Sequence, residues 1–255
     1  MPKERVPVVP LPVGTQVIGD LHLDIRDDQQ VARFCARLKQ MAGIPRLIIL
    51  GDLFEYWVGP AQLKSAEVPL SAMLALTAAG TAIDVIPGNR DFLMDRGFEE
   101  RSGATLHPTG FLGQSTSEAA GGSKVLFIHG DELCSLDLPY QRLRAVLRSK
   151  PARLFARSIP APLALRLAGR LRGASKQAIA VKPNATMEQQ APTCVDMAQA
   201  HGCETLVCGH AHRFRDEQLE GGPRWLVVDA FGGERDTLEI SQAGRLEVLK
   251  RTASA

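Results

Sequence analysis

Five segments of the sequence place a metal-binding side chain directly after a short apolar run. The segments are Gly19-Asp20-Leu21-His22, Gly51-Asp52, Gly88-Asn89, His129-Gly130-Asp131 and Gly209-His210-Ala211-His212. Carboxylate, amide and imidazole groups are ligands that suit Mn²⁺, Fe and Zn²⁺, and the lack of a C-x-x-C pair argues against a thiolate zinc site. The spacing therefore predicts a centre for divalent metal ions.

The types of these side chains predict two metal ions that share a ligand. A carboxylate can bridge two metals about 3.5 to 4 Å apart, and Asp52 is the natural candidate for the bridge. We assign Asp20, His22, Asp52 and His212 to one metal, and Asp52, Asn89, His129 and His210 to the other.

Each motif taken singly has an ordinary structural alternative. A Gly-Asp pair is often a helix cap or a turn, and a lone histidine is often a core or surface residue. Four of the six histidines fall in strand-end motifs, which favours the metal centre. His107 and His201 lack this context, and we interpret them as structural residues.

The apolar runs before the motifs predict the strands that must position these ligands. Runs at 17–18, 47–50, 83–86, 125–128 and 205–208 are separated by helix-like segments, of which 29–41 and 70–79 are the first two. This pattern predicts an α/β fold, in which ligands gather at the carboxyl ends of the strands. The later runs, at 225–228, 237–240 and 246–249, predict antiparallel strands that form a second sheet.

A basic block interrupts this alternation between residues 137 and 182. The chain has eleven basic residues and no acidic residue between Asp137 and Glu188. We interpret the chain as one domain, 1–255, with a helical cap inserted at 137–182. Leucines interleave with arginines over 163–172, which predicts a basic amphipathic stretch at an anionic membrane surface that admits acyl chains. The alternative is an ordinary helix that packs its apolar side on the core.

The composition excludes several other classes of protein. A net charge of +2 over 255 residues is too small for a generic nucleic-acid binder. The five cysteines are odd in number and lack a disulfide-like pattern, which favours a reducing cytoplasm. Prolines interrupt the apolar stretch near the N-terminus, so we expect neither a signal peptide nor a membrane span.

The motifs, in this order, resemble those of the calcineurin-like metallophosphoesterase superfamily. A narrower resemblance, to the UDP-2,3-diacylglucosamine diphosphatases, is carried by residues 51–57 (GDLFEYW), 88–93 (GNRDFL) and 129–131 (HGD), followed by Cys134, Asp137 and Tyr140-Gln141. The superfamily implies two packed sheets flanked by helices. The narrower family implies two Mn²⁺ ions, with Fe or Zn²⁺ as other metals that would fit. It also implies cleavage of the pyrophosphate of UDP-2,3-diacylglucosamine to UMP and 2,3-diacylglucosamine 1-phosphate (lipid X), a step of lipid A biosynthesis.

Arg90 supports this narrower family on physical grounds. Superfamily phosphatases usually carry histidine after the asparagine, where it could protonate an alkoxide leaving group. A sugar phosphate, whose second pKa is about 6, leaves without a proton, and an arginine can instead grip phosphate oxygens. The predicted mechanism is attack by a hydroxide that bridges the two metals, with Asn89 and Arg90 as catalytic residues. The structural alternative is that Arg90 only pairs with Asp91 or another carboxylate.

The resemblance also implies a set of substrate-binding residues. They are Asn89, Arg90, Asp137, Arg172, Ser175, Ile179, Lys182 and His210. The family has asparagine at the position of Ile179, and it differs from this chain at residues 58–60 and 230–233. The implied partners are a nucleotide-linked lipid substrate and the anionic inner face of the inner membrane, where a cytoplasmic enzyme would bind peripherally, with no nucleic acid.

Two other functions remain open at the level of sequence. The first is a soluble UDP-sugar or dinucleotide pyrophosphatase with the same two metals. The second is a non-catalytic membrane-binding module, although such a module would not need two metals. The sequence gives no acyl-chain length, native metal or oligomeric state.

Overall fold

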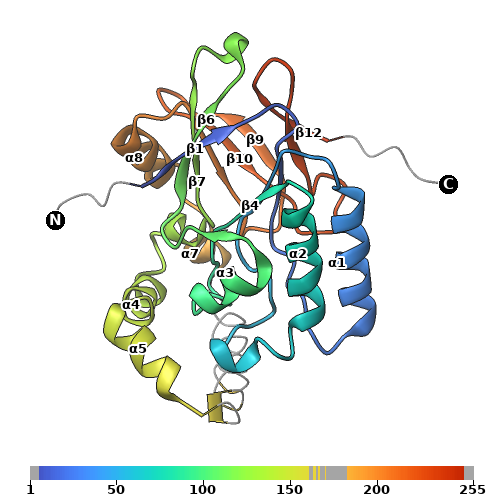
Figure 1. Ribbon diagram of the computed structural model, residues 1–255. Helices are drawn as coiled ribbons and strands as arrows, with labels where there is room; N and C mark the ends of the chain where they lie inside the picture. The colour runs from blue at the N-terminus through green and yellow to red at the C-terminus, as the bar shows by residue number, and fades with distance from the viewer. Residues whose placement is uncertain (1–5, 161–162, 165, 167–169, 171–182, 250–255) are drawn as a thin grey trace.

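The computed structural model of the protein describes residues 6–160, 163–164, 166, 170 and 183–249 (Figure 1). Two mixed six-stranded sheets pack face to face, and helices lie outside them. This arrangement confirms the predicted α/β two-sheet sandwich flanked by helices.

The first sheet, here called the β3 sheet, carries three of the five ligand-bearing strand ends. Its order is β12-β11-β2-β3-β4-β5, in which β2 to β5 are parallel and β11 and β12 are antiparallel additions next to β2. The bounds are β2 Gln16–Ile18, β3 Arg46–Ile49, β4 Ala82–Val85, β5 Thr105–Leu106, β11 Leu238–Ile240 and β12 Leu246–Val248.

The second sheet, the β7 sheet, carries the other two strand ends. Its order is β1-β6-β7-β8-β10-β9, with β7, β8 and β10 parallel to one another. The bounds are β1 Val8–Leu11, β6 Phe111–Ser115, β7 Lys124–Phe127, β8 Thr205–Cys208, β9 Arg215–Gln218 and β10 Arg224–Val227.

Helices cover the outer faces of both sheets. The bounds are α1 Asp28–Gln40, α2 Glu67–Ala78, α3 Arg96–Ser102, α4 Leu138–Leu147, α5 Lys150–Ser158, α7 Asn184–Met187 and α8 Ala191–His201, with short 3₁₀ turns η1 Pro60–Gln62, η2 Glu118–Ala120 and η3 Asp131–Leu133. Helices α1 to α3 pack on the β3 sheet and α8 packs on the β7 sheet. In Figure 1, α4 and α5 project from the body at the lower left.

The central strands β3, β7 and β8 are apolar along most of their length because they are buried on both faces. In β3, Leu47 and Ile49 pack toward α1 and α2, whereas Ile48 packs toward the other sheet. In β7, Phe127 lies between the sheets and Leu126 packs toward α8. Successive side chains of a strand point to opposite faces, so burial on both sides removes the polar alternation.

The prediction that the strands after Cys208 form a sheet of their own is wrong, because they are divided between the two sheets. Strand β10 pairs parallel with β8 in the β7 sheet, whereas β11 and β12 extend the β3 sheet beside β2. Strand β10 is buried along most of its length, so it lies inside a sheet, and the short β11 and β12 complete an edge. Apolar runs of this length do not encode which of two sheets they join.

Part of the predicted cap is described. Helices α4 and α5 lie within 137–182, and the interpretation of this segment as a cap stays a prediction. No helix in the described ranges is long and apolar enough to cross a bilayer.

Candidate metal centre

The five strand ends from both sheets meet at one place. Asp20 and His22 follow β2, Asp52 follows β3 and Asn89 follows β4, whereas His129 follows β7, and His210 and His212 follow β8. The site therefore lies across the carboxyl ends of the parallel strands of two packed sheets.

The first predicted ligand set is close enough to hold one metal ion. The Nε2 atoms of His22 and His212 are 2.8 Å apart, and His212 Nε2 is 3.6 Å from Asp20 Oδ1. Asp20, His22 and His212 each offer a ligand atom within 4.8 Å of the others.

The second predicted set surrounds the Nε2 atom of His129. Asn89 Oδ1 lies 3.2 Å from it, His210 Nδ1 lies 3.3 Å from it and Asp52 Oδ1 lies 3.9 Å from it. The other ring nitrogen of His129 is 2.7 Å from the carbonyl oxygen of Leu50, to which it can donate. That contact fixes the tautomer and leaves Nε2 free to act as a ligand.

Asp52 lies between the two sets. Its Oδ2 is 3.8 Å from His22 Nδ1, and its Oδ1 is 3.9 Å from His129 Nε2. This placement supports a bridging role. Asp20 also offers an oxygen to both groups of potential ligands, so two carboxylates lie near the midline of the site.

Unpaired buried atoms show that the donors fit a cation. Asp20 Oδ1 and His22 Nδ1 are buried with no hydrogen-bond partner, and Asp20 and Asp52 are each only 2% exposed. A buried polar atom without a partner is unfavourable by about 1 to 3 kcal/mol, which coordination would offset. The oxygen and imidazole donors match the preferences of Mn²⁺, Fe and Zn²⁺.

The electrostatics of the site are those of crowded carboxylates and imidazoles. Burial, together with the charge of Asp52, raises the pKa of Asp20 to about 7. Burial alone would lower the pKa of His129. The negative charges of Asp52, Asp131 and Asp20 have the larger combined effect and raise that pKa to about 9. Burial and the charge of His129 lower the pKa of His210 to about 4. Divalent cations bind carboxylates and imidazoles in their deprotonated forms, so they would replace protons here.

The backbone is strained at the same residues. Among the described residues, the non-glycine residues with positive φ are Asp20 (50°), His22 (48°), Asp52 (47°), His210 (70°) and His212 (53°). All of them are predicted ligands. Such conformations are unfavourable by about 1 to 3 kcal/mol each and cluster at functional sites, where the surrounding structure holds them.

Arg90 points toward the carboxylates of this site. Its Nη1 donates to Glu55 Oε2 at 2.7 Å, and its Nε is 3.5 Å from Asp52 Oδ2. Its backbone N–H also donates to Asp52 Oδ1 at 2.9 Å. Arg90 therefore does pair with a carboxylate, that of Glu55. A third of the Arg90 side chain nevertheless remains exposed. Glu55 was missed as a site residue, although it lies in the GDLFEYW motif.

Asp91, which the sequence suggested only as a partner for Arg90, accepts hydrogen bonds from backbone N–H groups. Its Oδ1 accepts from the N–H of Gly88 at 2.6 Å, and its Oδ2 accepts from the N–H of Leu53 at 2.7 Å and of Phe54 at 3.3 Å. The buried carboxylate therefore ties the loop after Asp52 to the loop before Asn89.

Asp131 anchors α4 beneath the site. Tyr140 Oη donates to its Oδ2 at 2.6 Å and Arg144 Nε donates to the same atom at 2.7 Å. Burial would raise the pKa of Asp131, but Arg148, His129 and Arg144 hold it well below its usual range. Asp131 therefore holds α4 against the loop after His129.

The predicted substrate residues of the cap are placed only in part. Asp137 caps α4, where its Oδ1 accepts from the N–H of Tyr140 at 3.1 Å. Arg172, Ser175, Ile179 and Lys182 lie outside the described residues.

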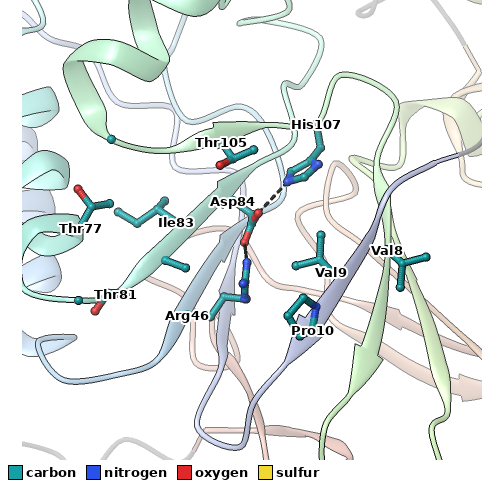
Figure 2. Close-up of a pocket in the computed structure, with 13 residues that line it drawn as sticks. Val8, Val9, Pro10, Arg46, Thr77, Thr81, Ile83, Asp84, Thr105 and His107 are labelled. Atoms are coloured by element: carbon teal, nitrogen blue, oxygen red, sulfur yellow. Dashed lines mark hydrogen bonds and ion pairs between the residues drawn. The ribbon is translucent and has the colours of Figure 1, made fainter.

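A separate open pocket of about 520 Å³ lies away from the metal centre (Figure 2). Asp84 is at its centre, paired with Arg46 on one side and with His107 on the other, where the separation is 2.7 Å. None of the predicted ligands lines this pocket. His107 is therefore a buried, paired histidine, as its lack of motif context indicates.

Gly51 is expected to tolerate no side chain. Its φ is 88°, and an added Cβ would lie 2.9 Å from Gly88 Cα and against the ring of His129. Gly43 has nearly the same φ, 90°, but nothing lies within 4 Å of a Cβ added there. Gly43→Ala should lower the free energy of unfolding by about 1 to 2 kcal/mol, because alanine is unfavourable at a positive φ even where it has room. Gly51→Ala should lower it by about a further 1 to 3 kcal/mol through the clash. Urea titration measures both values, and equal losses would contradict the close packing.

Comparisons with known proteins agree with this geometry. The profile of the calcineurin-like phosphoesterase family matches residues 16–214. A UDP-2,3-diacylglucosamine hydrolase of Aeromonas salmonicida is 35% identical over 94% of this chain and 94% of its own length. Enzymes of the same name from Pseudomonas putida and Ralstonia nicotianae are 35% and 36% identical, and cover 89% and 83% of this chain and 95% and 82% of their own lengths.

Proposed function

Because the chain belongs to the calcineurin-like phosphoesterase family, we propose that it hydrolyses the pyrophosphate of UDP-2,3-diacylglucosamine to UMP and 2,3-diacylglucosamine 1-phosphate. The observation that carries this proposal is that seven side chains able to bind metal lie together, with Arg90 beside them. The printed names of relatives that match along most of the chain support the substrate.

The two metal sets are proposed as assigned above. Asp20, His22, Asp52 and His212 would hold one Mn²⁺, and Asp52, Asn89, His129 and His210 would hold the other, with Fe or Zn²⁺ compatible with the same donors. Two bound cations would lower the pKa of a water molecule and offset the charge of the phosphoryl oxygens.

The chain's own residues then position the pyrophosphate. The oxygen of water joins the phosphorus of the UMP half while that water releases a proton to solvent, and the bond from that phosphorus to the bridging oxygen breaks. The sugar phosphate leaves as an anion and takes no proton from Arg90, because an arginine stays charged at neutral pH. Glu55 holds one edge of the guanidinium, so the exposed edge can bind phosphate oxygens.

The cap segment 137–182 is proposed to receive the lipid part of the substrate, with Asp137, Arg172, Ser175, Ile179 and Lys182 near the glucosamine phosphate. The described part of this segment contains several large exposed apolar side chains; they are Leu138, Leu143, Val146, Leu154, Phe155 and Leu163. Leu154 and Phe155 are each 70% exposed. Apolar groups among basic residues favour acyl chains and an anionic bilayer. We therefore place the protein peripherally on the cytoplasmic face of the inner membrane.

The test compares substrates and surfaces in one assay of UMP release. Purified protein with Mn²⁺ should hydrolyse UDP-2,3-diacylglucosamine with kcat/KM at least about 100-fold above that for UDP-N-acetylglucosamine, because several buried methylenes each contribute about 0.8 kcal/mol. Presenting the lipid in anionic vesicles rather than zwitterionic ones should raise the rate further, because the cap is basic.

The other outcomes would point to other functions. Equal rates on both substrates would favour a soluble UDP-sugar or dinucleotide pyrophosphatase. Bound Mn²⁺ with no hydrolysis of either substrate would favour a non-catalytic module. Equal rates on the two kinds of vesicle would contradict the membrane proposal alone.

A further inference from the structure

Arg148, at the C-terminal end of α4, contacts the loops that carry two of the proposed ligands. Its Nη2 donates to the carbonyl oxygen of Gly88 at 3.0 Å and lies 3.4 Å from Asp131 Oδ2. Its Nη1 donates to the carbonyl oxygen of Pro108 at 3.4 Å. One guanidinium therefore joins the cap to three segments of the body.

Two of these contacts are adjacent to proposed ligands of the same metal set. Gly88 directly precedes Asn89, and Asp131 lies two residues after His129. Asn89 Oδ1 and His129 Nε2 are 3.2 Å apart, so a small shift of either loop changes their spacing. Arg90, next along the first loop, donates its N–H to Asp52.

The contact with Gly88 distinguishes Arg148 from its neighbours on α4. Arg144 also pairs with Asp131, at 2.7 Å, and with Glu132. Asp131 therefore keeps Arg144 and Tyr140 as partners when Arg148 is changed. The hydrogen bonds lost with Arg148 are those to the carbonyl oxygens of Pro87 and Gly88, which precede Asn89, and to that of Pro108. A lysine retains the charge but not the planar fork that reaches several acceptors at once.

We propose that Arg148 is a positioning residue that couples the placement of α4 to the geometry of the metal set formed by Asn89 and His129. The inference rests on the proposed function, because it concerns the same two-metal site. Among the described contacts, Arg148 forms no hydrogen bond or ion pair with a predicted ligand side chain, so its effect is exerted through the loop that holds Asn89.

The test is the Mn²⁺ binding isotherm of the purified full chain, measured by calorimetry without substrate. Arg148→Lys should weaken one of the two binding steps by about 10- to 100-fold, the range typical of residues that orient metal ligands, and leave the other step unchanged. In a double-mutant cycle, Arg148→Lys should add little to the loss caused by Asn89→Ala, because both changes act on the same set.

Two matched variants on α4 separate this role from general effects. Arg142 is exposed on the same helix, so Arg142→Lys should leave the isotherm unchanged. Arg144→Lys should also leave it nearly unchanged, and a loss equal to that of Arg148→Lys would overturn coupling through Gly88. If Arg148→Lys does not fold, Arg148→Gln, with a shorter planar donor, takes its place.

The remaining outcomes are distinct. Two binding steps in Arg148→Lys within twofold of those of the unchanged protein would refute the positioning role and leave the proposed function intact. An unchanged protein that binds no divalent cation would refute the proposed function, and the inference with it.

Discussion

Replacing Asp52 by alanine is expected to abolish the paired binding of Mn²⁺ and to lower kcat at least about 10³-fold, equivalent to about 4 kcal/mol of transition-state stabilisation. Asp52 is 2% exposed, and its two oxygens face one histidine of each ligand set, at 3.8 and 3.9 Å. The Oδ2 of Asp52 also lies 3.5 Å from Arg90 Nε. Metal content and UMP release measure the two effects.

Two further variants test whether Asp52 acts by its charge or by holding the fold. Asp52→Asn keeps an acceptor for the N–H of Arg90 but removes the bridging charge, so it should lose activity almost as fully as Asp52→Ala. Asp28→Ala alters an exposed aspartate in the first turn of α1 and should leave both measurements unchanged. Full activity in Asp52→Ala would remove the bridging role.

The convergence of the proposed ligands could be predicted because its signal is local. Each ligand follows an apolar run within four residues, and strand ends of parallel sheets gather at one edge. Asp20, Asp52 and His129 are accordingly brought together, although they come from two sheets. The assignment of β10 and β11 to sheets could not be predicted, because strands buried on both faces have the same apolar pattern in either sheet.

Other features of the site have no local signal. Asp91 bonds to backbone N–H groups of Leu53 and Phe54, which are 38 and 37 residues away in sequence. The positive φ of His22 and His210 follows from the assembled site, since histidine gives little indication of that conformation beforehand. Such features depend on which loops meet in space.

Arg90 shows how the structure sharpens a prediction made from residue type. The sequence indicated an arginine that binds phosphate, with pairing to a carboxylate as the alternative. The structure contains both elements, because Glu55 holds Nη1 while a third of the side chain stays exposed. A guanidinium anchored on one side is already oriented before the substrate binds, which favours transition-state stabilisation over simple attraction.

Arg90→Ala is therefore expected to lower kcat by about 10²- to 10³-fold with little change in KM, as for loss of a preorganised donor that acts mainly in the transition state. Arg90→Lys should recover part of this loss, because it restores charge without the planar fork. Mn²⁺ content should stay that of the unchanged protein, because the backbone N–H of residue 90 still donates to Asp52. Steady-state release of UMP and metal analysis measure these quantities.

A matched arginine and the anchoring carboxylate complete the test. Arg96→Ala removes an exposed arginine paired with Glu100 and should leave kcat unchanged. Glu55→Gln should lower kcat less than Arg90→Ala, because the guanidinium remains but loses its charged anchor. If kcat/KM of Arg90→Ala falls in proportion to its Mn²⁺ content, Arg90 supports the metal ligands and does not bind the phosphate. Retention of full kcat would leave Glu55 and Arg90 as a structural ion pair.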